Sequence, residues 1–186
     1  MPVTTHQLIA ANAANPGYAI ARVLAVQAVQ HFNAVRPAHA GIGPASCCAA
    51  FAVNAAPAAG FPALTGQVYS ATFGNSQIAA GGLDMGPVGG HAERCAITAA
   101  GNNHLTPIAP VAVLFVELSP CMPCGTWLGG GGGGVANPYN FGAAPAGLDL
   151  HVWYAFPYDA AGIAAMVTFH NRLPADQAAR AAALTW

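Results

Sequence analysis

The sequence predicts an α/β protein, a three-layer α/β/α sandwich around a single mixed sheet of about five strands. Three observations predict it. The continuous apolar run at residues 111–116 is typical of a strand that is covered on both faces. Segments with apolar residues at helical spacing lie before and after this run. Two short segments rich in β-branched and aromatic residues precede it and indicate further strands.

The N-terminal part is expected to be helical. Residues 4–35 are rich in alanine, and apolar side chains from Ile20 to Phe32 recur at helical spacing. We expect one or two helices here, broken near the Asn15-Pro16-Gly17 sequence. Residues 47–53 and 67–73 follow and are predicted to pair as an antiparallel hairpin.

Helices and strands alternate in the rest of the chain. Residues 91–100 are predicted as a helix that ends at Gly101 and the two asparagines after it. Residues 111–116 are the best candidate for the central strand. A short helix should follow and stop near Leu128, because a run of glycines occupies 129–134. The remaining elements are predicted as a strand at 148–156, a strand or buried helix at 162–169, and a final helix at 173–184.

The chain carries few charges. Charged residues make up 6% of its 186 residues, lysine is absent, and the net charge is −1. Tight, salt-sensitive binding of a polyanion is therefore not predicted from charge alone. No apolar run reaches the ~20 residues that span a bilayer, and the N-terminus shows no secretory signal. We expect no membrane partner and a location in the cytoplasm, or delivery into a target cell by a non-classical secretion system.

The cysteines point to a metal site. There are five of them, at 47, 48, 95, 121 and 124, and only Cys121 and Cys124 have ligand spacing. An odd, clustered set suits a reduced metal site better than a disulfide framework.

Two short motifs supply a complete set of zinc ligands. They are His91-Ala92-Glu93 and, thirty residues after His91, the Pro120-Cys121-Met122-Pro123-Cys124 sequence. Catalytic zinc keeps three protein ligands and one open position. We therefore expect His91, Cys121 and Cys124 to bind one catalytic Zn²⁺. The start of a helix at the cysteines would favour their thiolate forms.

Glu93 is the candidate acid–base residue. It lies two residues after His91, which is too close for an easy fourth ligand on a helix but suited to reaching a water that the metal activates. It would take a proton from this water, pass it to a ring nitrogen of the substrate, and help ammonia to leave.

The two motifs resemble those of zinc-dependent nucleobase deaminases, which share a His-x-Glu followed by Pro-Cys-x-x-Cys. Residues 91–97, with the sequence HAERCAI, resemble the corresponding helix of free cytidine deaminases. The resemblance covers roughly residues 48–156 and implies membership of the cytidine deaminase-like superfamily. It implies the cytidine deaminase-like fold in a single deaminase domain over 1–186, with an N-terminal helical segment at 1–40 and a core at 45–186. It also implies that zinc is the cofactor and that Asn75 contacts the sugar of the substrate.

The chain also departs from free cytidine deaminases. Gly125 and Thr126 follow Cys124 where those enzymes usually have Arg-Gln, and the glycine run cuts the helix short. In this respect the chain looks more like the deaminase domains of bacterial polymorphic toxins, some of which edit DNA or RNA. A toxin-like identity implies an immunity protein, an inhibitor, as a partner.

The leading interpretation is a hydrolytic deaminase that converts cytosine to uracil in single- or double-stranded DNA. A free cytidine, deoxycytidine or nucleotide deaminase is the alternative, favoured by the 91–97 helix and the scarcity of basic residues. A non-catalytic, zinc-stabilised binding module is the third interpretation. Adenine or guanine as the substrate base also stays open.

Several further residues are expected to lie near the metal site, in the core or at the surface. A base could stack on an aromatic ring such as that of Trp127. Arg94 is expected to support a thiolate or the backbone, Cys95 to lie in the core, and Cys48 and His170 to lie at the surface or at a strand end. The candidate substrate contacts are Asn75, Phe73, Ala92, Trp127 and Ser119.

Overall fold

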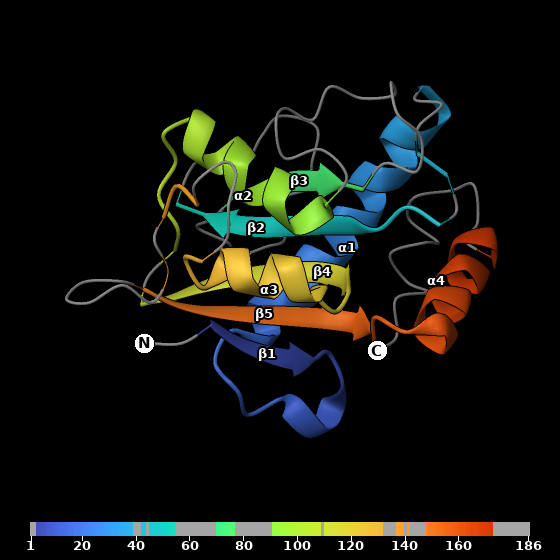
Figure 1. Cartoon of the computed structure of the whole chain (residues 1–186), viewed down its shortest axis with the longest axis horizontal. Coiled ribbons are helices and arrows are strands. Elements are labelled where there is room, and N and C mark those ends of the chain that lie inside the picture. Colours follow the sequence, from blue (N-terminus) through green and yellow to red (C-terminus); the bar gives the residue numbers. More distant parts are fainter. Residues whose placement is uncertain are drawn as a thin grey trace.

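The computed structural model describes residues 3–38, 42–43, 45–54, 70–76, 91–108, 110–131, 137–139, 141 and 148–172. In chain order the elements are β1 (Val3–Gln7), η1 (Ala10–Asn12), α1 (Tyr18–Val35), η2 (Arg36–Ala38), β2 (Cys48–Val53), β3 (Ser70–Asn75), α2 (Ala92–Asn102), β4 (Val111–Leu118), α3 (Met122–Leu128), β5 (Asp149–Phe156) and α4 (Ala160–Arg172). The strands form one mixed sheet in the order β1-β5-β4-β2-β3. Helix α1 covers one face, and α2 and α3 cover the other (Figure 1). The predicted sandwich around a single mixed sheet is confirmed.

Strand β4 is the central strand, as predicted. It pairs parallel with β5 and antiparallel with β2. Its side chains alternate between the faces, so Val113 and Phe115 pack in the cluster under α1, whereas Leu114 and Val116 pack in the cluster under α2 and α3. Both faces are covered, which explains why the strand is a continuous apolar run.

The predicted hairpin and the later elements are also present. Strands β2 and β3 pair antiparallel, with Phe51 opposite Thr72. Of the two options for residues 162–169, the structure has a helix, α4. The helix expected at 173–184 lies outside the described residues. Among those that are described, no helix has both the length and the apolar character needed to cross a membrane.

The prediction of helix for residues 4–17 was wrong. Residues Val3–Gln7 form β1, a strand at the sheet edge that pairs parallel with β5, and α1 begins only at Tyr18. Alanine dominates the region as a whole, but β1 itself contains none and starts with three β-branched residues, which favour a strand. The N-terminal residues therefore belong to the same sheet as β2 to β5.

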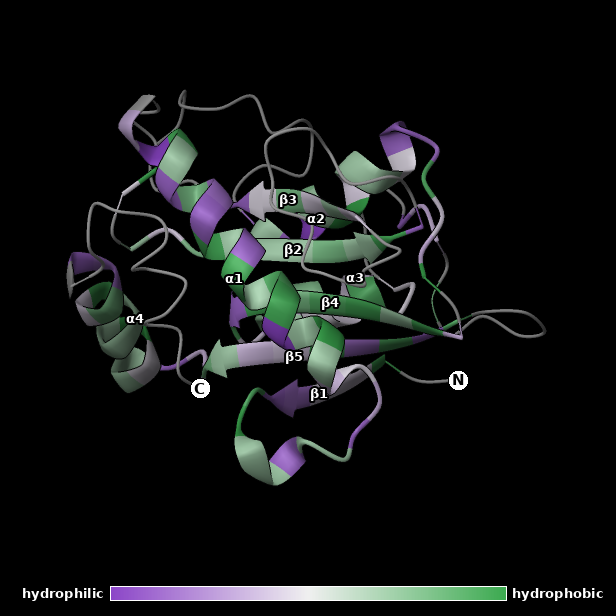
Figure 2. Cartoon of the chain, turned by 180° about the vertical axis from the view of Figure 1, so that it is seen from behind, coloured by the Kyte–Doolittle hydropathy of each residue, from purple (hydrophilic) through white to green (hydrophobic). Residues whose placement is uncertain are grey.

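Two side chains expected at the surface or a strand end are buried instead. Cys48 is in the core cluster beneath α1, and His170 of α4 is buried against Glu117 of β4. Helix α1 crosses this face of the sheet, as Figure 2 shows from behind, and it shields Cys48 from solvent. A cluster of buried polar groups thus adjoins the apolar core on the α1 side.

His31 on α1 should make stability depend on pH. Its ring stacks on Phe73 of β3 with the centroids 4.5 Å apart, and burial lowers its pKa from 6.5 to about 4. Between these values the unfolded chain binds a proton that the folded chain does not, so stability should be full above pH 6.5 and fall as the pH drops toward 4. In the parent protein the free energy of unfolding should fall between pH 7.5 and 4.5, and His31→Phe should make this fall smaller by ~2–3 kcal/mol. Urea unfolding at the two pH values measures the difference. The exposed His104, changed to Asn, is the control; an equal slope in both variants would contradict the assignment.

Candidate metal centre

Four chain segments meet at one edge of the sheet. The carboxyl ends of the parallel strands β4 and β5 lie there, β2 begins there, and β3 ends there. Beyond β4 the chain reaches Cys121, which caps the N-terminus of α3, and His91 caps the N-terminus of α2. Pro120 disfavours helix at the preceding Ser119, while Pro123 fits the first turn of α3 because no intrahelical donor is needed there. The two helix starts lie close together, because the ligand atoms of His91, Glu93, Cys121 and Cys124 are all within 4.8 Å of one another.

Three predicted metal ligands form a close cluster. The Sγ atoms of Cys121 and Cys124 are 3.1 Å apart, and the Nδ1 atom of His91 lies 3.1 Å from Cys124 Sγ and 3.8 Å from Cys121 Sγ. Tetrahedral zinc, with bonds of about 2.3 Å to sulfur and about 2.0 Å to nitrogen, sets these separations at about 3.5–3.8 Å. Each atom needs to shift by only a few tenths of an ångström. His91, Glu93, Cys121 and Cys124 together could hold one metal ion.

The donor chemistry also fits zinc. Burial raises the pKa of the Cys124 thiol, and the negative charge of Glu93 and the neighbouring Cys121 raise it further. A cation at this position would offset the negative charge and so favour the thiolate of Cys124. Two thiolates and one imidazole are ligands that zinc prefers.

Glu93 is the fourth member of the cluster. Its side chain is 5% exposed, on the first turn of α2, and one carboxylate oxygen lies within 4.8 Å of each of the other three ligand atoms. It also lines the cavity beside the cluster. A carboxylate so placed can accept or return a proton at any group that enters the cavity next to the metal position.

Arg94 of α2 contacts two residues of α3, Pro123 and Trp127, beside the ligand cluster. Arg94 Nη2 donates a hydrogen bond of 2.9 Å to the Pro123 carbonyl, and its guanidinium lies 5.5 Å from the Trp127 ring centre. This agrees with the prediction that Arg94 has a backbone partner. Trp127 is 2% exposed and packs in the core with Leu128, on the side of α3 that faces the sheet. The structure therefore does not place Trp127 where a base could stack on it.

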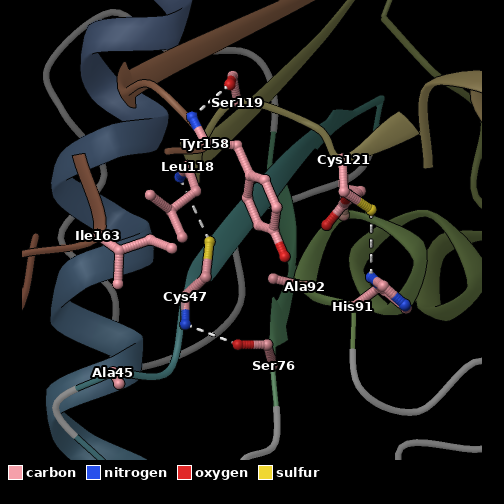
Figure 3. Close-up of a pocket in the computed structure, with 11 residues that line it drawn as sticks. Ala45, Cys47, Ser76, His91, Ala92, Leu118, Ser119, Cys121, Tyr158 and Ile163 are labelled. Carbon is pink, nitrogen blue, oxygen red and sulfur yellow. Dashed lines mark hydrogen bonds between the residues drawn. The ribbon is translucent and has the colours of Figure 1, made fainter. Parts of the chain in front are cut away.

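A cavity of about 180 Å³ adjoins the cluster. His91, Glu93 and Cys121 form one side of it. Two of the candidate substrate contacts, Ala92 and Ser119, also line it. Figure 3 shows these residues together with Tyr158 and Ser76 around the same space.

The other two candidate contacts, Asn75 and Phe73, are placed differently. Phe73 stacks on His31 and packs in the cluster beneath α1, on the opposite face of the sheet from α2. It is directed away from the cavity, because that face is where the alternation of side chains puts it. Asn75 is buried at the end of β3, and within the described part of the chain its Oδ1 has no hydrogen-bond partner. The next residue, Ser76, lines the cavity, so a substrate contact from Asn75 stays a prediction.

Tyr158 is a cavity residue that sequence reasoning missed. Its ring lies across the cavity in Figure 3, with the hydroxyl directed toward Ala92, and 56% of the residue is exposed. Its backbone N–H donates to Ser119 Oγ at 2.8 Å, which holds the turn after β5 against the end of β4. The available signal was an aromatic residue between Pro157 and Asp159, directly after a predicted strand at the carboxyl end of the sheet.

Comparison with known proteins gives no match. No family model, no curated protein and no solved structure matches the chain. The interpretation of the site therefore depends on its own geometry, which combines two sulfur ligands, one imidazole, a buried carboxylate and an adjoining cavity.

Replacing Cys124 by Ser should remove the metal. A serine hydroxyl is a poor substitute for thiolate, so zinc bound after dialysis should fall from about one ion per chain to well below half. Elemental analysis of the purified proteins measures this. Cys95→Ala is the matched control, because Cys95 is buried on the same helix as Glu93 but is not part of the cluster. Full zinc content in Cys124→Ser, or loss of zinc from Cys95→Ala, would contradict the ligand assignment.

Proposed function

We propose that the chain is a zinc-dependent hydrolytic deaminase that converts cytosine to uracil. The observation that carries this proposal is the cluster of His91, Cys121 and Cys124, with a buried Glu93 carboxylate beside it and a cavity next to both. If His91, Cys121 and Cys124 are the ligands, zinc keeps an open position for water, as catalytic zinc requires. A purely structural zinc would instead take Glu93 as its fourth protein ligand, and the cavity that Glu93 lines supports the catalytic arrangement.

Glu93 is the proton carrier in this proposal. Zinc held by the three ligands would act as a Lewis acid that makes hydroxide available near pH 7. The Glu93 carboxylate accepts the proton that water gives up and delivers it to N3 of cytosine, which makes C4 more electrophilic. It would then take the remaining proton from the hydroxyl group on C4 and deliver it to the amino nitrogen as the C4–N bond breaks, so that cytosine and water yield uracil and ammonia.

The cavity has room for a single-ring base. A cavity of 150 Å³ in another protein holds benzene, and the cavity beside the cluster has about 180 Å³. A pyrimidine ring therefore fits beside Glu93. The choice of cytosine over adenine and guanine rests on the resemblance of residues 91–97 to the helix of free cytidine deaminases.

Tyr158 takes the place that the sequence suggested for Trp127. Its ring borders the cavity and is open to solvent, so an unpaired base can stack on it as the amino group enters toward Glu93. We propose cytosine in DNA as the substrate, in keeping with the resemblance to toxin-type deaminases.

Free cytidine is the second candidate, and one observation favours it. The whole chain has five arginines and no lysine, and Arg94 is already engaged by Pro123 and Trp127. Strong attraction for a phosphate backbone therefore has little basis in charge.

Glu93→Gln should retain zinc and lose activity. Glutamine keeps the size of the side chain but cannot carry the proton, so the rate should fall by ~10²–10⁴-fold. The assay follows uracil in single- and double-stranded oligonucleotides and uridine from cytidine, beside the Cys95→Ala control. Oligonucleotide turnover alone supports the DNA substrate, and cytidine turnover alone supports the second candidate. Unchanged activity in Glu93→Gln would show that Glu93 is not the proton carrier. If the parent protein binds zinc but turns over none of these substrates, the interpretation as a non-catalytic binding module is favoured.

Tyr158→Ala should weaken substrate binding. Loss of stacking on one base costs roughly 1–3 kcal/mol, so KM should rise by about 5- to 150-fold with little change in kcat. Tyr158→Phe retains the ring and is the matched control. Steady-state kinetics of the two variants make the comparison, and an unchanged KM in Tyr158→Ala would rule out stacking on this residue.

A further inference from the structure

A buried polar pair connects the central strand to α4. Glu117 of β4 and His170 of α4 both have fully buried side chains, and Oε1 lies 2.6 Å from Nε2. The other carboxylate oxygen, Oε2, accepts the Cys48 backbone N–H at 3.0 Å. The imidazole and the carboxyl group thus share one proton in a short hydrogen bond. Both oxygens of Glu117 are therefore partnered, and one of the partners is a side chain near the C-terminal end of α4.

Helix α4 has a narrow buried side. Among its described side-chain positions only Gly162, Met166 and His170 are buried, at successive steps of four residues. Met166 packs into the apolar core, and Gly162 lies so close to Pro157 that a Cβ would meet the Pro157 carbonyl oxygen at 2.0 Å. The hydrogen bond between His170 and Glu117 thus attaches the C-terminal part of α4, a largely exposed helix, to the sheet. Figure 1 shows α4 beside the end of the sheet.

The beginning of the same segment is also held by the end of β4. Ser119 Oγ accepts the Tyr158 N–H at 2.8 Å, and Asp159 Oδ1 accepts the Gly162 N–H at 2.7 Å. Ser119 follows Glu117 by two residues. The stretch 117–119 therefore holds both ends of the segment 158–170, and the same chain continues directly to Cys121.

Two side chains of this segment line the cavity. Figure 3 shows Ile163 on the side of the cavity opposite His91, and the Tyr158 ring between them. Leu118 of β4, three residues before Cys121, also lines the cavity. A rotation or a shift of α4 would carry Ile163 away from the cavity and pull on the turn that carries Tyr158. An apolar contact such as that of Met166 is non-directional and resists such a shift less than a hydrogen bond does.

We propose that Glu117 and His170 form a positioning pair that fixes α4, so that Tyr158 and Ile163 stay in place over the cavity for substrate binding. This inference rests on the proposed function for its catalytic meaning, since the positioned residues are those that would contact the base. Neither Glu117 nor His170 touches the cavity, so the pair acts only through the segment 158–163.

The test removes the pair without leaving an unpaired buried charge. Glu117→Gln combined with His170→Leu keeps an acceptor for the Cys48 N–H and removes both ionisable groups, which proteins often tolerate when one removal alone is damaging. His170→Gln is the matched control, because its amide can still donate to Glu117. If the double variant does not fold, Glu117→Gln combined with His170→Asn takes its place with the same expectations, because neither residue is ionisable and the shorter amide does not reach position 117 as the imidazole does.

Two readouts are expected to change. Amide hydrogen exchange at residues 158–163 should become at least tenfold faster in the double variant and stay as in the parent protein in His170→Gln. KM for the pyrimidine substrate should rise by about 5- to 10-fold with kcat changed less than about twofold and zinc content unchanged. In a Tyr158→Ala background the same double change should raise KM little further, because the positioned ring is already gone.

Unchanged exchange at 158–163 in the folded double variant would overturn the proposal, as would an equal rise in KM with and without Tyr158→Ala. Amide exchange needs no substrate. If the parent protein deaminates no pyrimidine, the proposed function fails on that result, while the exchange comparison still decides whether the pair holds the segment.

Discussion

The site depends on one constraint. Two sulfurs, one imidazole nitrogen and one carboxylate lie so close together that they can bind a single cation between them. The sulfur and nitrogen atoms lie 3.1–3.8 Å apart, and the Glu93 carboxylate is nearly buried beside them. Ionised sulfurs at these distances repel one another and the carboxylate unless a cation lies between them. A bound ion would therefore join the starts of α2 and α3, two elements that are far apart in the sequence.

The sheet explains why these elements meet. Parallel strands β4 and β5 end at one edge, and ligands in α/β proteins commonly bind outside the carboxyl ends of such strands. Strand β4 is the centre of this arrangement, since it is covered on both faces and its end leads through Ser119 to Cys121. The same end carries Glu117, which is paired with His170 of α4. The segment 117–121 thus carries a metal ligand, part of the cavity wall and the residue that binds α4.

The sequence predicted the elements and ligands that depend on local patterns. The central strand is a continuous apolar run, and the hairpin segments are rich in β-branched and aromatic residues. The ligand motifs are contiguous, so their residues lie together once two helix starts are adjacent. The N-terminal strand was not predicted because its partner is β5, and His6 and His151, which share a hydrogen bond across these strands, are 145 residues apart. Trp127 was assigned to the cavity because spacing alone does not show that its face of α3 is turned to the sheet. The pairing of Glu117 with His170, 53 residues apart, left no local signal.

X-ray absorption at the zinc edge measures which atoms bind the ion. In the protein loaded with one equivalent of zinc, we expect two sulfur scatterers at about 2.3 Å and two nitrogen or oxygen scatterers at about 2.0 Å, one of the latter exchangeable with solvent or with an added anion. Addition of an anion should then change the spectrum only in the nitrogen and oxygen shell. A shell of four protein ligands that does not respond to added anions, or one that lacks the two sulfurs, would show that the ion is not held by His91, Cys121 and Cys124 with an open position.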